Sequence, residues 1–217
     1  MLENLLKYLA PQQVKLVAVS KTKPLDQIMG FYEREYKVFG ENRVQELVQK
    51  QEALPKDIEW HFIGHLQSKK VKHIAPFVAL IHSVDSLKLL KEINKQAKKN
   101  DRVIDCLLQF HIAEEESKFG FNLETAKMAL ESTDFQEFKN IRVVGVMGMA
   151  SNTEDKNKIR REFKDLKSIF EVLKSNYFEN APYFKELSMG MTGDYKIAVE
   201  EGSTIVRIGS LLFGARK

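Results

Sequence analysis

Short runs of β-branched and aromatic residues alternate with segments whose apolar residues recur every three or four positions, along the whole chain. The first kind of run favours buried strands, and the second favours amphipathic helices. Eight strands are predicted on this basis, at residues 14–20, 36–40, 60–63, 77–83, 103–112, 141–149, 184–188 and 204–208. Strands that alternate with helices pair in parallel, and eight such units form a closed (β/α)8 TIM barrel, an α/β fold.

Two segments show the helical pattern most clearly. Residues 1–12 predict a leading helix before the first strand. Further on, a segment rich in Lys and Arg carries apolar residues at helical spacing, namely Ile159, Phe163, Leu166, Phe170 and Leu173. This spacing predicts an amphipathic helix with a solvated basic face rather than a nucleic-acid site. Ser151, with Glu154 three residues later, fits a capping box at its start.

An open, doubly wound sheet is the alternative arrangement of the same elements. No Gly-x-Gly-x-x-Gly follows a predicted strand and no P-loop is present, so the two commonest nucleotide sites of open sheets are missing from the sequence. No linker, low-complexity stretch or short repeat divides the chain. We therefore expect residues 1–217 to form a single TIM-barrel domain.

Composition and charge narrow the range of locations and partners. The chain has 34 Lys and Arg against 30 Asp and Glu, and a net charge of +4 is too small to predict nucleic-acid binding. Apolar runs such as residues 143–150 are far shorter than the roughly 20 residues of a transmembrane helix, and the first residues do not resemble a secretory signal. The single cysteine, Cys106, excludes an intramolecular disulfide and is predicted to be buried. These features predict a cytoplasmic protein.

Polar residues follow several predicted strands at the end where a TIM barrel carries its functional groups. Lys21 shares the alternation of Val17 and Val19, so one orientation directs its amine into the mouth of the barrel. Desolvation there would lower the pKa of the amine and leave more of the neutral form, which condenses with aldehydes to a Schiff base. A surface lysine before a helix is the alternative, and we prefer it for Lys23, which is adjacent to Pro24.

Hydroxyl groups and glycines at the ends of the last two strands indicate an anion site. Ser188 with Gly190, and Gly209 with Ser210, offer hydroxyls and a close approach to backbone N–H groups. Barrels frequently hold phosphate between these two loops. Alternatively, the glycines only turn the chain from strand to helix.

Arg207 shares the alternation of Ile205 and Gly209 and, if it faces inward, is a permanent cation beside the predicted phosphate loop. The alternative is a salt bridge at the end of the barrel. Beside a pyridine nitrogen, an arginine would keep that nitrogen unprotonated and weaken the ring as an electron sink.

The histidines do not have the spacing of a metal site. His61 and His65 are four residues apart, but a strand and a glycine lie between them, so a helical zinc motif is not expected. His82 and His111 end predicted strands, where they could line the mouth, although hydrogen-bonded structural histidines are the commoner outcome. The acidic run at residues 114–116 is predicted to be a solvated loop.

Five separated motifs, in order along nearly the whole chain, together resemble the pyridoxal phosphate homeostasis protein family. They are VAVSKTKP at residues 17–24, GENRVQE at 40–46, WHFIGHLQ at 60–67, LSMGMT at 187–192 and GSTIVRIGSLLFGAR at 202–216. The resemblance implies a barrel similar to the N-terminal domain of alanine racemase, which binds pyridoxal 5′-phosphate (PLP). Family members often have Thr where Ser210 stands, so the hydroxyl is kept.

The resemblance also implies roles for individual residues. Lys21 would hold PLP as a covalent Schiff base, and Arg207 would lie beside its pyridine nitrogen. Phosphate ligands would be Ser188, Gly209 and Ser210. The rest of the cofactor site would be lined by Asn42, His65, Met189, Gly190 and Thr192.

The implied function is intracellular PLP (vitamin B6) homeostasis with little or no catalysis. Racemisation needs acid/base groups on both faces of the cofactor, and alanine racemase takes the second from an additional domain that this sequence, ending at Lys217, is not expected to have. A low-activity PLP-dependent amino acid racemase or lyase is one alternative, and a phosphate-binding barrel without PLP is another. We expect PLP-dependent apoenzymes as recipients, neither nucleic acid nor membrane as partner, and a monomer or weak homodimer.

Overall fold

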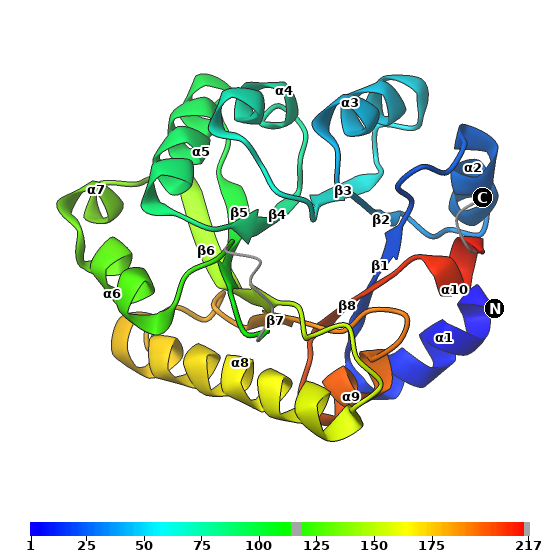
Figure 1. Ribbon diagram of the computed structural model, residues 1–217. Helices are drawn as coiled ribbons and strands as arrows, with labels where there is room; N and C mark the ends of the chain where they lie inside the picture. Colours follow the sequence, from blue (N-terminus) through cyan, green and yellow to red (C-terminus); the bar gives the residue numbers. More distant parts are fainter. Residues whose placement is uncertain (114–118, 215–217) are drawn as a thin grey trace.

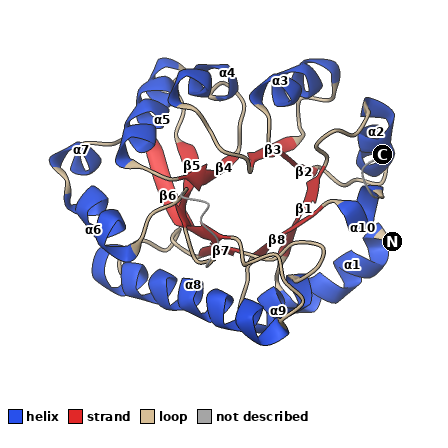
Figure 2. Cartoon of the chain, viewed as in Figure 1, coloured by secondary structure: helices blue, strands red, loops and turns tan. Residues whose placement is uncertain are grey.

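The computed structural model describes residues 1–113 and 119–214. Eight parallel strands close into a barrel in sequence order, with the eighth strand paired to the first. Figures 1 and 2 look along the barrel, and the strands form a central ring with the helices outside it. The predicted TIM barrel is confirmed, and the open sheet is excluded because no strand is left at an edge of this ring.

The strands lie where the β-rich runs predicted them, with ends that differ by a few residues. They are β1 (Lys15–Val19), β2 (Val38–Glu41), β3 (Glu59–Phe62), β4 (Leu80–Val84), β5 (Ile104–Phe110), β6 (Ile141–Gly148), β7 (Glu186–Ser188) and β8 (Ile205–Ile208). All eight pairings are parallel. Their carboxyl ends therefore meet at one end of the barrel, which we call the mouth; the opposite end is the base.

Helices and short 3-10 turns connect the strands on the outside of the barrel (Figure 2). They are α1 (Leu2–Leu9), η1 (Ala10–Gln12), α2 (Leu25–Tyr32), α3 (Val44–Ala53), η2 (Ser68–Lys70), α4 (Val71–Ile74), α5 (Leu87–Lys99), α6 (Leu123–Glu131), α7 (Thr133–Gln136), α8 (Lys156–Tyr177), α9 (Tyr195–Glu200) and α10 (Ser210–Phe213). The leading helix predicted over residues 1–12 is confirmed as α1 continued by η1, and its leucines pack with residues of β1 and β8.

The amphipathic helix α8 is confirmed, and all five of its predicted apolar residues are buried. The capping box predicted at Ser151 is wrong, because α8 begins at Lys156 and Asp155 caps it. Ser151 is committed elsewhere: its backbone N–H and its hydroxyl donate to the two carboxylate oxygens of the buried Glu162, at 2.7 and 2.6 Å. A charged acceptor in the interior outcompetes the local cap.

The hydrophobic core has two layers separated by the strands. The larger layer lies between strands and helices, and the smaller fills the barrel interior with Val17, Leu80, Leu107, Val144, Met147 and Ile205. Because side chains alternate along a strand, β1, β4, β5 and β6 contribute apolar side chains to both layers. Residues in register with the interior set therefore point into the barrel.

Three further expectations concern single segments. Cys106 is fully buried, as predicted, and burial raises the pKa of its thiol. The acidic run at 114–116 lies outside the described residues, as does the end of the last motif. Across the two described ranges, no helix is long and apolar enough to cross a membrane.

Candidate functional site

A cavity of about 410 Å³ lies at the mouth of the barrel. Its volume is within the range of small-molecule sites. Six of the ten residues predicted for the site line it: Lys21, Asn42, His65, Arg207, Gly209 and Ser210. They are far apart in sequence and converge because they end or follow strands whose carboxyl ends meet here.

Lys21 lies just beyond the end of β1, as its alternation predicted. Val17 belongs to the barrel interior, whereas Val19 and Lys21 line the cavity. Lys23 does not line it, because its Nζ donates to the backbone carbonyls of Phe213 and Gly214 at 2.9 and 3.1 Å. The two lysines of this motif therefore have different environments.

A buried ionic cluster supports the Lys21 turn from outside the barrel. The Nζ of Lys50, on α3, donates to Glu41 Oε1 and Glu46 Oε1 at 2.7 Å each, and to the backbone carbonyl of Ser20 at 2.8 Å. Ser20 Oγ donates to the same Glu41 oxygen at 2.6 Å. Glu46 also accepts from the backbone N–H of Thr22. The residues on both sides of Lys21 are thus fixed by one cluster, which we call the Lys50 cluster.

Burial raises the pKa of the Glu41 carboxyl above its usual value, although Lys50 and Ser20 oppose this effect. Glu41 and Lys50 have side chains that are 0% and 5% exposed, so their ion pair is shielded from water. A buried pair of this kind stabilises the fold only while both members are present, since either charge alone would be uncompensated.

Arg207 enters the same cavity from β8, the neighbour of β1. It is buried, and its nitrogens donate to Ser188 Oγ at 2.6 Å and to the Gly148 carbonyl at 3.1 Å. Burial lowers the pKa of the guanidinium to about 10, and the charge of Asp194 partly opposes this effect. Within the described part of the chain Arg207 has no ion pair, so its predicted alternative role at a salt bridge is not seen.

The four remaining predicted residues do not line the cavity: Ser188 ends β7, and Met189, Gly190 and Thr192 belong to the loop that follows it. Ser188 and Met189 are fully buried. At Gly190 the φ angle is +93°, and a Cβ would approach the Cβ of Ala198 to 2.5 Å, so the position requires glycine. Thr192 is half-buried. The loop nevertheless adjoins the site, because Gly190 accepts a backbone hydrogen bond of 2.9 Å from Arg207.

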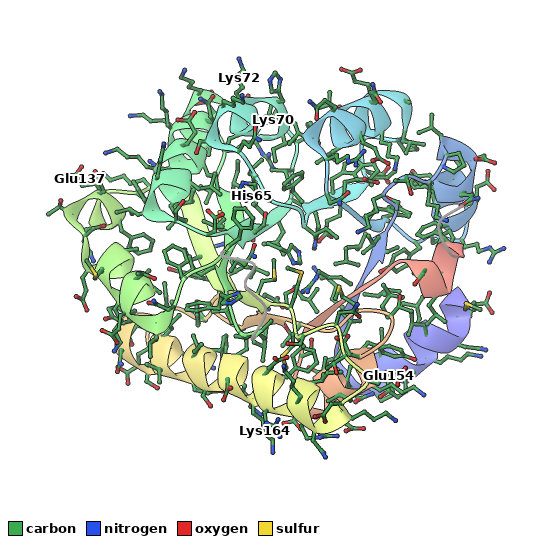
Figure 3. The ribbon with its side chains drawn as sticks, viewed as in Figure 1. His65, Lys70, Lys72, Glu137, Glu154 and Lys164 are labelled. Carbon is green, nitrogen blue, oxygen red and sulfur yellow. The ribbon has the colours of Figure 1, made fainter. Side chains whose placement is uncertain are left out.

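His65 brings an imidazole to the same cavity. Its Nδ1 lies 3.3 Å from Asp85 Oδ2, and its ring faces that of Phe119 with centroids 4.4 Å apart. Figure 3 shows His65 over the barrel, whereas the other labelled residues, such as Lys72 and Lys164, lie at the periphery. His61, four residues earlier, is buried, and the described residues contain no cluster that could hold a metal ion.

The similarity of this chain to known proteins extends over almost its full length. Residues 2–217 match the family model described as alanine racemase, N-terminal domain. The pyridoxal phosphate homeostasis protein of Aquifex aeolicus is 45% identical over 204 residues, which cover 94% of this chain and 87% of that protein. This chain belongs to the pyridoxal phosphate homeostasis protein family.

Solved structures agree with this membership. PipY of Synechococcus elongatus, in a structure without PLP, is 32% identical with a TM-score of 0.87, covering 98% of this chain and 99% of that one. The structure of PipY with PLP bound is 31% identical with a TM-score of 0.84, covering 99% and 100%. The sequence motifs therefore identified the family correctly.

Several residues at this family member's site were missed by sequence reasoning. Gln109 and Met149, which end β5 and follow β6, also line the cavity. The same strand-end argument used for Lys21 could have found them, because both alternate with interior residues of their strands. Lys50 had a weaker signal, its four-residue spacing from Glu46, which is more typical of a solvated surface pair.

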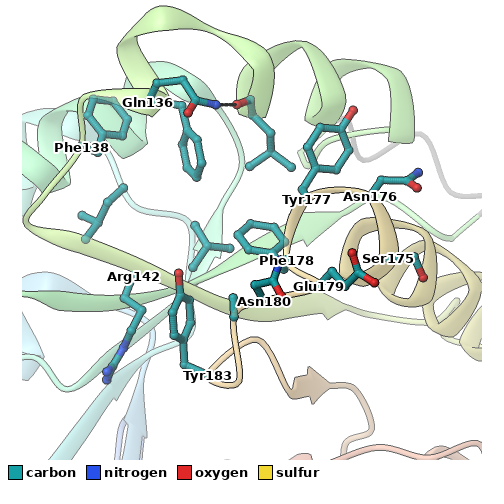
Figure 4. A pocket seen from close by; sticks show the side chains of 15 residues that line it. Gln136, Phe138, Arg142, Ser175, Asn176, Tyr177, Phe178, Glu179, Asn180 and Tyr183 are labelled. Carbon is teal, nitrogen blue, oxygen red and sulfur yellow. Dashed lines mark hydrogen bonds between the residues drawn. The ribbon is translucent and has the colours of Figure 1, made fainter.

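A second, larger cavity of about 460 Å³ lies away from the mouth, between α6, α7 and the carboxyl end of α8 (Figure 4). Its polar groups are occupied locally: the Gln136 amide donates to the Leu130 carbonyl at 3.1 Å, and Arg142 pairs with Asp105 at 2.7 Å. Residues 176, 179 and 180 add further polar side chains, but none of the residues predicted for the site lines this cavity. We therefore place the functional site at the mouth.

Proposed function

We propose that this chain is a cytoplasmic PLP-binding protein that holds PLP at the mouth of its single domain, with the cofactor's aldehyde linked to Lys21 Nζ. The observation that carries the proposal is that Lys21 and Arg207 line one cavity from adjacent strands. The names of the Aquifex aeolicus relative and of the PLP-bound PipY structure support the choice of ligand.

The residues present fit the parts of PLP. Bound PLP supplies an electrophilic aldehyde and an aromatic ring that withdraws electrons. The Lys21 amine can add to the aldehyde with loss of water. Arg207 has only hydrogen-bond donors, so it suits an unprotonated pyridine nitrogen, which accepts. A Cβ at Gly209 would lie 3.1 Å from the Val19 carbonyl. Because glycine has no Cβ, an anion such as the phosphate can approach the backbone here and accept from the Ser210 hydroxyl.

Little or no turnover is part of the proposal. An arginine beside the ring nitrogen reduces electron withdrawal, and this restricts the carbanion chemistry of the cofactor. The function is then storage and delivery, with PLP-dependent apoenzymes as recipients. A monomer and a weak homodimer both remain compatible with this function.

Borohydride reduction and peptide mapping test the proposal directly. After incubation with PLP, reduction is expected to leave a pyridoxyl group on Lys21, and Lys21→Ala is expected to abolish both this adduct and the visible absorption of the bound cofactor. Lys23→Ala is the matched control, since Lys23 lies two residues away but outside the cavity. Labelling of Lys23 alone, or scattered labelling of surface lysines, would overturn the proposal.

A low-activity racemase or lyase is the alternative, and one observation favours it. His65 is in the cavity with Asp85 beside it, an arrangement that can orient an imidazole for proton transfer. Exchange of the α-deuterium of amino acids measures such activity. We expect no exchange above background; exchange by the wild type that is lost in both Lys21→Ala and His65→Gln would establish the alternative.

A further inference from the structure

A hydrogen-bonded chain of side chains crosses the barrel from base to mouth. At the base, Glu59 Oε1 lies 2.9 Å from His61 Nε2. His61 Nδ1 is 2.9 Å from His82 Nε2, and His82 Nδ1 is 2.9 Å from Ser188 Oγ. The chain ends at Arg207, whose Nη1 donates to the same Ser188 oxygen at 2.6 Å. Four strands, β3, β4, β7 and β8, thus contribute one connected series of polar groups.

The middle residues of this hydrogen-bonded series lie inside the barrel and are shielded from solvent. His61 is in register with Leu80, and Ser188 with Met147 and Ile205, all three of which belong to the barrel interior. His61, His82 and Ser188 are fully buried. The Glu59 end opens to solvent: its side chain is 40% exposed, and it lines a basal cavity of about 370 Å³. The Arg207 end is buried but lines the cavity at the mouth.

With both imidazoles neutral and Glu59 ionised, the donors and acceptors of this hydrogen-bonded series can be arranged in only one direction. Arg207 has donors only, so Ser188 Oγ accepts from it and can use its own proton to donate to His82 Nδ1. His82, neutral, then carries its proton on Nε2 and donates to His61 Nδ1. His61 in turn donates from Nε2 to the carboxylate of Glu59, which only accepts. The ionised Glu59 end imposes this order on two neutral imidazoles, and the acceptor role of Ser188 toward Arg207 is compatible with it.

Electrostatics favour the neutral imidazoles that this order requires. Burial lowers the pKa values of both His61 and His82, and the charges of Arg207 and Lys15 lower that of His82 further. At the base, the hydrogen bond from His61 lowers the pKa of Glu59 to about 2, with Lys15 contributing to the same effect. The carboxylate is therefore ionised, and the two histidines neutral, near neutral pH.

We propose that Glu59, His61, His82 and Ser188 are positioning residues for Arg207, and that they make PLP binding at the mouth depend on a carboxylate at the base. The inference rests on the proposed function, since Arg207 is there assigned to the pyridine nitrogen. It also gives Ser188 a specific role: its hydroxyl is committed to His82 and Arg207, so it orients the guanidinium rather than donating to the phosphate.

The proton order is tested by a measurement that depends on neither PLP binding nor enzymatic activity. Long-range ¹H–¹⁵N spectra of the full-length ¹⁵N-labelled protein, with and without PLP, report the tautomer of each imidazole. Both His61 and His82 are expected in the neutral form with the proton on Nε2 at pH 7. An Nδ1–H tautomer or an imidazolium at either residue would overturn the inference, whatever the outcome of the reduction experiment on Lys21.

The coupling between base and mouth is tested by substitution of Glu59. Glu59→Gln keeps an acceptor for His61 without the charge, whereas Glu59→Leu removes the acceptor. We expect the side-chain ¹⁵N signals of Arg207 to shift in both variants, and PLP affinity to fall by about tenfold in Glu59→Leu, the free-energy equivalent of one hydrogen bond, and by less in Glu59→Gln.

Asp105→Asn is the matched control, because Asp105 lines the same basal cavity but pairs with Arg142, and neither residue belongs to the hydrogen-bonded series from Glu59 to Arg207. It is expected to change PLP affinity less than twofold and to leave the Arg207 signals in place. The coupling is refuted if the Arg207 signals do not move in either Glu59 variant, or if Asp105→Asn moves them equally. Loss of PLP binding in every protein, wild type included, would instead contradict the proposed function.

Discussion

Two buried cations of this barrel have opposite surroundings. Lys50 lies between the strands and α3, where it donates to two carboxylates and a carbonyl. Arg207 lies at the mouth, where its side chain donates to a hydroxyl and a carbonyl, both uncharged. The charge of Asp194 acts on Arg207 without a hydrogen bond between them, and the series of hydrogen bonds from Arg207 ends at the carboxylate of Glu59, at the other end of the barrel.

The difference separates a structural cation from a binding one. A cation buried with its carboxylates is already compensated, and its role is to hold the segments that supply them. A buried cation whose hydrogen-bond partners are neutral, and which has a cavity beside it, can still bind an acceptor of a ligand. Position in a cavity and incomplete compensation together distinguish the two better than burial does, since both are buried.

The largest effect that this comparison predicts is on folding stability. Lys50→Met would leave the buried Glu41 carboxylate without its partner, and we expect the free energy of unfolding to fall by about 3–5 kcal/mol. Urea denaturation monitored by circular dichroism measures it, with Lys72→Met, an exposed lysine on α4, as the control. A loss below about 1 kcal/mol would show that the Lys50 cluster is not structural.

Arg207→Met should have a smaller effect on stability than Lys50→Met and a larger effect on PLP binding. No buried carboxylate loses its partner, so the cost in unfolding free energy is about 1–3 kcal/mol, from the acceptors left at Ser188 and Gly148. PLP affinity, in contrast, should fall much further in Arg207→Met than in Lys50→Met. Both affinities are measured at a temperature where both variants are folded. Equal retention of PLP by the two variants would remove the distinction between the cations.

The smallest predicted effect is on the dependence of folding stability on acidic pH. Because His61 and His82 have folded-state pKa values below the unfolded value of about 6.5, their neutral forms contribute stability above that pH, and the contribution is lost as the pH falls below it. His82→Gln removes one of the two groups, so the slope of stability against pH between 6 and 5 should decrease by up to about 1.4 kcal/mol per unit. Unfolding curves at several pH values measure the slope.

The exposed His73 provides the control for this slope, since His73→Gln should leave it unchanged. A wild-type stability that does not decrease between pH 6 and 5 would contradict the neutral, buried state of both imidazoles, and with it the proton order inside the barrel.

The sequence by itself determined the elements, their order and the family. Strand and helix periodicities are local, so β1 to β8 and α8 could be located without any knowledge of contacts. The alternation around Lys21 and Arg207 showed that one of two orientations directs both to the mouth, and the barrel decided which. The Ser151 cap failed because its competitor, Glu162, approaches only when α8 packs on the barrel.

Only the tertiary structure decided which polar residues meet. Ser188 and His82 are 106 positions apart, and Lys50 and Ser20 are 30 apart, so no local pattern relates them. Closure of the barrel brings their strands together and removes water from between them, and burial then determines which groups are charged and which way each proton points. For this reason the place of Lys21 in the mouth cavity could be anticipated from the sequence, whereas the groups that hold the site in place could not.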